Sequence, residues 1–254
     1  MIRSVRSLRL VENVLVFPEL PSTQEFSRRL VSALDEEEMR LLPTAVVAAS
    51  QTSGKGRGGR TWHSPAGGIY VTMILPAPSL ADSIHLPLSA AVVLVEMIRG
   101  AWNVSAAIKW PNDVLVEGRK IAGLLLELVH TRDPGRSLVL VGLGLNLETR
   151  ALAGADLSSA AALSEFVAEP VHSGEVVDRI LDAYDHEASF PRSREEILSR
   201  WKELSIHRPG EPIRVRRQGD EWIAGTYAGL DEVGRLVLDT DEGRKLIASA
   251  DVER

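Results

Sequence analysis

The chain has 254 residues, of which 44% are hydrophobic and 25% charged, a globular composition with length for one large and one small domain. Its 35 acidic and 29 basic side chains give a net charge of -6, which argues against a dedicated nucleic-acid-binding protein because a phosphate backbone would be repelled. Cysteine is absent, which excludes disulfides, thiolate metal sites, iron–sulfur clusters and a cysteine nucleophile.

Membrane insertion and protein-held metals are not expected. No apolar run approaches the roughly 20 residues of a membrane span, and residues 1–9 lack the apolar core and cleavage site of a signal peptide. The six histidines show no zincin spacing, so we expect no tightly bound transition metal. These features predict a cytoplasmic protein.

A helix, two strands and a loop are predicted first along the chain. Ser22 followed three residues later by Glu25 is a capping-box pattern that predicts a helix start. An apolar strand follows at 44–49, then a loop rich in glycine and arginine at 51–60, then a strand at 69–75.

The middle of the chain predicts a buried helix and several central strands. Residues 88–102 are apolar on most sides, as in a buried helix. Runs at 114–116 and 120–129 are joined by a tight hairpin at 117–119, and another strand occupies 138–147. Helical periodicity returns at 176–184 and 197–201. We therefore predict an α+β fold, with a mixed-sheet domain at residues 1–204.

The last fifty residues change in character. Short β-prone runs at 213–217, 222–227, 235–238 and 245–248 are separated by turn residues. This predicts a small all-β barrel at 205–254, which buries little apolar surface alone and is expected to dock on the larger domain.

The glycine-rich loop superficially matches two nucleotide-binding motifs. Gly54, Gly56 and Gly59 form GxGxxG, and the same stretch is close to a P-loop, but both motifs require a helix directly after the glycines. Here Trp62 to Gly68 leads into a strand, so both assignments fail. The remaining interpretations are a basic loop for an anionic ligand or a solvated turn.

A second group of polar residues surrounds the next hairpin. Asn112 and Asp113 either shape a turn or contact a nucleotide's ribose or metal. Lys120, at the start of an apolar strand, either extends to solvent or neutralises a carboxylate and a phosphate that approach each other.

Taken in order, these segments resemble the biotin protein ligases, also called biotin–acetyl-CoA-carboxylase ligases. The matching segments are Ser22–Gln24, Gln51–Trp62, Ser64-Pro65, Lys109–Asp113, Arg119–Gly123, Glu127 and Gly142–Asn146. The last fifty residues also resemble the family's SH3-like C-terminal domain. The resemblance implies that biotin and ATP, with Mg²⁺ on the nucleotide, give biotinyl-5′-AMP and pyrophosphate, and that a lysine of a biotin carboxyl carrier protein then accepts biotin. The resemblance is also compatible with a homodimer.

The resemblance also implies roles for individual residues. Lys120 and Arg57 are the implied catalytic residues. Implied biotin-binding residues are Ser22, Thr23, Gln24, Gln51, Gly54, Lys55, Gly56, Arg57, Lys120 and Gly123. Implied ATP- or adenylate-binding residues are Arg57, Arg60, Trp62, Asn112, Asp113, Lys120 and Asn146, with Asp113 as a weak candidate for contacting Mg²⁺. Ser22 is also explained by helix capping alone.

The sequence departs from the best-known form of the family. Lys55 and Gly58 stand where the loop usually has arginines, which removes bidentate contacts. Only about 20 residues precede Ser22, so we expect the form without the N-terminal DNA-binding domain found in some relatives. Lipoate or octanoate ligation, and a non-catalytic biotin or adenylate sensor, are the alternatives.

Overall fold

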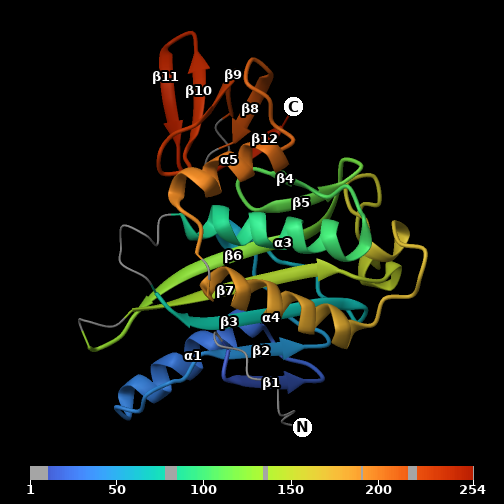
Figure 1. Ribbon diagram of the computed structural model, residues 1–254, viewed down its shortest axis with the longest axis vertical. Helices are drawn as coiled ribbons and strands as arrows, with labels where there is room; N and C mark the ends of the chain where they lie inside the picture. Colours follow the sequence, from blue (N-terminus) through green and yellow to red (C-terminus); the bar gives the residue numbers. More distant parts are fainter. Residues whose placement is uncertain (1–10, 78–84, 134–136, 190, 217–221, 254) are drawn as a thin grey trace.

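Two β-sheets organise the chain. The computed structural model describes residues 11–77, 85–133, 137–189, 191–216 and 222–253 (Figure 1). The large sheet has seven strands in the order β1-β2-β3-β7-β6-β5-β4, and only β1 and β2 are parallel. Its strands are β1 (Asn13–Phe17), β2 (Thr44–Ala48), β3 (Gly68–Pro76), β4 (Ala107–Lys109), β5 (Asp113–Val116), β6 (Arg119–His130) and β7 (Ser137–Asn146).

Alternation of side chains along the strands creates two different faces of this sheet. On β3 and β7, Val71, Met73, Val141 and Leu143 belong to the main core. The intervening Ile74, Leu138 and Leu140 belong to a smaller core with Val31 of the first helix. Because successive side chains of a strand point to opposite faces, the two cores lie on opposite sides of the sheet.

The helices are divided between these faces. They are α1 (Thr23–Glu36), α3 (Leu86–Trp102), α4 (Ser173–Ser189) and α5 (Arg194–Leu204), with short 3₁₀ turns at Arg57–Gly59, Thr149–Leu152 and Leu163–Glu165. Buried residues of α3, α4 and α5 join the main core, and α1 covers the other face. Figure 1 shows α3 and α4 running side by side across the sheet. The part of this second face that α1 does not cover can therefore form the floor of a ligand site.

The predicted elements of the large sheet are confirmed, but two of its strands were missed. Ser22 caps α1, since its Oγ accepts a hydrogen bond from Glu25 N at 3.4 Å. The 117–119 hairpin forms, and its two corner residues, Glu117 and Gly118, have φ of 50° and 79°, as a type I′ turn requires. Strands β1 and β4 were not predicted. Residues 1–9 and Arg217, which carried predictions, lie outside the described residues.

The small sheet has five antiparallel strands in the order β11-β10-β9-β8-β12. They are β8 (Pro212–Arg216), β9 (Trp222–Leu230), β10 (Leu236–Thr240), β11 (Gly243–Ile247) and β12 (Asp251–Glu253). The prediction included four of them and missed β12. Among the described residues the pairing does not join β11 to β12, so this sheet is open rather than a closed barrel.

The small sheet docks beside α5, β4 and β5 (Figure 1). The Trp110 indole Nε1 donates to Gly234 O at 3.1 Å, and Trp110 N donates to His207 Nε2 at 3.1 Å. These bonds join the segment that follows β4 to the last fifty residues. The predicted docking of the small domain on the large one is thereby confirmed. The domain boundary at 204/205 remains a prediction. In the described part of the chain, no helix has the length and apolar character needed to cross a membrane.

Candidate functional site

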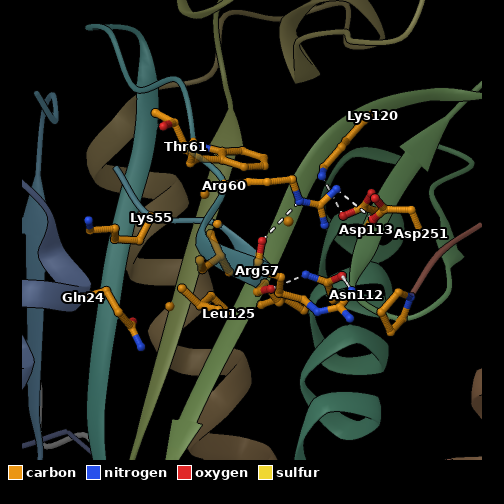
Figure 2. A pocket seen from close by; sticks show the side chains of 18 of the residues that line it. Gln24, Lys55, Arg57, Arg60, Thr61, Asn112, Asp113, Lys120, Leu125 and Asp251 are labelled. Carbon is orange, nitrogen blue, oxygen red and sulfur yellow. Dashed lines mark hydrogen bonds and ion pairs between the residues drawn. The ribbon is translucent and has the colours of Figure 1, made fainter. Parts of the chain in front are cut away.

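A cavity of about 400 Å³ lies on the α1 side of the large sheet, and the small sheet also contributes to its lining. Its lining comes from the start of α1, the glycine-rich loop, the β4–β5 connection, β3, β6, β7 and β12. Figure 2 shows side chains from these segments converging on one space. Residues far apart in the sequence therefore share one site.

Small residues leave room above the sheet. A Cβ on Gly142 would lie 2.5 Å from Gln24 Oε1, and one on Gly144 would lie 2.5 Å from Trp62 Nε1. A Cβ on Gly123 would lie 2.9 Å from Trp62 Cζ3. These three positions therefore allow Gln24 and the Trp62 indole to lie directly against the strands. The space above Gly123, expected for biotin's rings, is occupied here by the indole.

Neutral polar side chains form one wall of the cavity. Thr23 N and Thr23 Oγ1 donate to Gln51 Oε1 at 2.7 and 3.2 Å, and Gln51 Nε2 donates to Ser64 Oγ at 2.8 Å. Thr72 Oγ1 lies 2.9 Å from Thr23 Oγ1 and 3.3 Å from Gln24 Oε1. This wall offers both donors and acceptors, as a neutral polar ligand requires.

Positive charge gathers at another side of the cavity. Lys120 Nζ forms an ion pair with Asp113 Oδ1 at 2.6 Å and lies 4.9 Å from the centroid of the Trp62 ring. Arg60 Nη1 pairs with Asp251 Oδ1 of β12 at 2.7 Å. Figure 2 shows Lys120, Asp113, Arg60 and Asp251 close together, whereas Lys55 lies away from them.

Arg57 joins the loop to both sheets. Its Nη1 donates to Asn112 Oδ1 at 2.9 Å, and its Nη2 contacts Ser249 Oγ. Burial, together with the charge of Arg60, lowers the pKa of Arg57 from its usual range, although Asp113 and Asp251 oppose the shift. Removing this guanidinium from water favours an anionic partner in the cavity.

The conformation of the loop excludes the two helical phosphate motifs. Arg57–Gly59 forms only a single 3₁₀ turn, in which Gly58 has φ of 62° and Gly59 has φ of 78°. The chain then continues to β3, as predicted. Gly58 here occupies a left-handed conformation that glycine adopts without strain.

Most predicted site residues line the cavity, and two do not. Residues in the lining are Ser22, Thr23, Gln24, Gln51, Lys55, Gly56, Arg57, Arg60, Trp62, Asn112, Asp113, Lys120 and Gly123. Gly54 lies behind the polar wall, where a Cβ would be 2.4 Å from Ser64 Oγ. Asn146 is buried outside the lining, and its Nδ2 donates to Ala161 O at 3.2 Å. Its implied role in nucleotide binding stays a prediction.

The structure adds residues to which sequence reasoning gave no role. Thr72, Lys109, Arg216 and Asp251 line the cavity. Asp251 is on the missed strand β12, where Arg60 and Arg216 both pair with it. Burial opposes ionisation of Asp251, but the charge of Arg60 and the hydrogen bond from Arg216 outweigh it and hold the pKa of Asp251 below its usual range. For Thr72, the sequence offered one signal that was not used: a polar residue within an otherwise apolar strand.

A resident metal centre is not indicated by the described residues. They contain no cluster of three or more His, Cys, Asp or Glu side chains that could hold a metal ion. Three carboxylates line the cavity, Asp113, Asp251 and Glu253, and each pairs with a lysine or arginine.

Comparison with known proteins gives consistent matches over both sheets. Residues 17–146 match the biotin/lipoate A/B protein ligase family, and residues 210–254 match the biotin protein ligase C-terminal domain. The bifunctional ligase/repressor BirA of Bacillus subtilis (strain 168) is 32% identical over 248 residues, which span 95% of this chain and 74% of the relative. A biotin–[acetyl-CoA-carboxylase] ligase of Paracoccus denitrificans is 35% identical over 82% of this chain and 88% of its own length.

A solved structure agrees with these sequence matches. The biotin protein ligase from Aquifex aeolicus, in complex with biotin and ATP, superposes with a TM-score of 0.75 at 27% identity. The match covers 96% of this chain and 99% of that one.

Proposed function

This chain belongs to the biotin/lipoate A/B protein ligase family, and we propose that it activates biotin with ATP and transfers it to a lysine of a carrier protein. One observation carries the proposal: a neutral polar wall and a cluster of cations face the same cavity of about 400 Å³. A ligand with a polar, uncharged head and a carboxylate fits both parts. ATP supplies the second anion.

The first step joins two anions. A carboxylate oxygen of biotin attacks the α-phosphorus of ATP, the bond from that phosphorus to the bridging oxygen breaks, and pyrophosphate leaves with the electron pair. In this proposal Lys120 contacts both the carboxylate and the α-phosphate, and Arg57 and Arg60 contribute positive charge; all three side chains line the cavity. Fixed cations of this kind stabilise the charge that develops in phosphoryl-transfer transition states.

The second step is aminolysis of the mixed anhydride. The neutral amine of the carrier lysine attacks the biotinyl carbonyl carbon, AMP leaves, and the amine nitrogen loses its proton. Arg57 bridges Asn112 and Ser249 at the side of the cavity, so it is placed to retain the adenylate until the carrier arrives. No side-chain nucleophile of this chain is needed.

The polar wall favours biotin over lipoate or octanoate. Thr23, Gln51 and Thr72 present hydroxyl and amide groups whose remaining hydrogen-bonding capacity a ureido head can use and an apolar acyl head cannot. A non-catalytic sensor would not require Arg57, Arg60 and Lys120 in the same cavity.

Magnesium enters this proposal with the nucleotide. Mg²⁺ is commonly held by one or two carboxylates together with substrate phosphates, and Asp113 would supply such a carboxylate once Lys120 turns to the ligand. The ion would neutralise phosphate charge. Biotin binding alone would then be independent of Mg²⁺.

The test is incubation with biotin, Mg-ATP and a biotin carboxyl carrier domain, followed by mass spectrometry. We expect biotinyl-AMP without the carrier, and one biotinylated carrier lysine with it. Parallel reactions with lipoate and octanoate distinguish the related ligases. Absence of both products with a competent carrier would reject the proposal.

A further inference from the structure

Glu127 lies outside the cavity lining but is bonded to a residue that belongs to it. Gln24 Nε2 donates to Glu127 Oε2 at 3.3 Å. Arg28, one helical turn after Gln24 on α1, donates to the same carboxylate through Nε at 2.7 Å and Nη2 at 2.8 Å. The hydrogen bond from Arg28 lowers the pKa of Glu127 more than burial raises it, and Gln24 adds to the lowering. Glu127 is therefore held as an anion.

An ionised carboxylate fixes the direction of the neighbouring amide. It can only accept hydrogen bonds, so the NH₂ group of Gln24 must face Glu127. Gln24 Oε1 is then turned toward Thr72, at 3.3 Å from its Oγ1, directly over Gly142. Gln24 is only 4% exposed, so water offers little compensation for an amide that points the wrong way.

The second amide of the wall, that of Gln51, is also fixed by its hydrogen bonds. The hydroxyls of Thr72 and Thr23 lie 2.9 Å apart, and Thr23 Oγ1 donates to Gln51 Oε1. The oxygen of Gln51 also accepts from Thr23 N, which directs its NH₂ group toward Ser64. The amides of Gln24 and Gln51 are thus each oriented by their neighbours, and Gln24 takes its orientation from the charge of Glu127.

We propose that Glu127, held by Arg28, is a positioning residue for biotin that acts through Gln24. The ureido head of biotin has two N–H donors and one carbonyl acceptor, so it is recognised only by a wall of fixed polarity. Loss of the Glu127 charge lets the Gln24 amide rotate and present donors where the ligand needs an acceptor. The cations around ATP are not connected to Glu127 by any described bond, so the effect is confined to biotin.

The inference rests on the proposed function and predicts a selective loss of affinity. Glu127→Gln should raise the Kd and KM for biotin about tenfold, the ratio expected for a hydrogen bond to a charged group. Arg28→Met should shift the same constants in the same direction. The KM for ATP and the adenylation rate constant at saturating biotin should stay within about twofold of the parent, since the reacting atoms are untouched.

Arg29→Met is the matched control. Arg29 follows Arg28 on the same helix, is 80% exposed and pairs with Glu25 instead of Glu127. It should leave both substrates unaffected. Calorimetry with biotin alone, steady-state kinetics and thermal unfolding are measured for all variants.

The outcomes separate the two proposals. Failure of the parent to bind biotin rejects the proposed function. If the parent binds biotin, unchanged biotin constants in Glu127→Gln and Arg28→Met overturn the positioning role. Equal losses for biotin, ATP and unfolding temperature would also overturn it, because they indicate a structural role only. If Glu127→Gln does not fold, Arg28→Met decides between the outcomes. The Arg28 side chain is 42% exposed, so its replacement should leave the fold intact.

Discussion

The ammonium of Lys120 lies 2.6 Å from the carboxylate of Asp113, and this pair connects β6 to the start of β5 inside the cavity. Both side chains are partly exposed, so the pair itself adds little to stability. We propose that its role is positional: Asp113 holds the lysine inside the cavity until the lysine turns to the ligands.

Lys120→Ala is expected to lower the rate of biotinyl-AMP formation about 100-fold or more, the loss typical of one preorganised electrostatic partner. Single-turnover assays with labelled ATP measure this step directly. Lys245→Ala, which removes a lysine paired with Glu242 on the small sheet, serves as the control and should react like the parent. A parent-like rate for Lys120→Ala would remove Lys120 from the mechanism.

Arg57→Gly should make the enzyme release its intermediate. The guanidinium that bridges Asn112 and Ser249 is lost, so the adenylate is retained less well. Free biotinyl-AMP in the filtrate and biotin on lysines of an added bystander protein are the measurements. Arg244→Gly removes an arginine that pairs with Asp239 on the small sheet and should cause neither effect. Identical release rates in Arg57→Gly and the parent would contradict the role.

Asp251 should link the small sheet to the loop in a pH-dependent way. The pKa of Asp251 is lower in the folded state than in the unfolded chain, so the unfolded chain takes up protons first as pH falls. The stabilisation that Asp251 provides is therefore fully present above its unfolded pKa, and it is lost as pH falls through its folded pKa. The thermal midpoint of Asp251→Asn should therefore lie below the parent's at pH 7, and the two should converge at acidic pH. Asp241→Asn, an exposed aspartate in the β10–β11 turn, should match the parent throughout. A difference that stays constant down to acidic pH would refute this linkage.

Gly144→Ala should weaken biotin and adenylate binding and destabilise the fold by about 1–3 kcal/mol, as overpacking does. Its Cβ would lie 2.5 Å from the Trp62 indole, which must then move from the sheet. Gly100→Ala, in α3 with no atom within 4 Å of the new Cβ, should instead be neutral or stabilise by up to about 1 kcal/mol. Calorimetric binding and denaturant unfolding compare the two. Parent-like biotin affinity in Gly144→Ala would show that the indole position is unimportant.

Local patterns predicted most of the fold because helix caps, turns and apolar runs depend on residues that are close together in the sequence. Apolar runs located β2, β3, β6 and β7, and Ser22 located the start of α1. Three strands were missed because their sequences are short or mixed. Strand β1 follows a polar segment, β4 has three residues, and β12 has three residues of which two are charged. The open edge of the small sheet could not be predicted, since strand closure depends on pairing between distant segments.

The sequence by itself determined most of the elements, the basic loop and, through ordered motifs, the family to which the chain belongs. Only the tertiary structure decided which side chains meet. It brought Asp251 to Arg60 across nearly 200 residues, placed Thr72 and Lys109 in the cavity, and turned Asn146 toward Ala161. The physical reason is that periodicity fixes the face on which a side chain lies, whereas sheet register and domain docking fix what it faces.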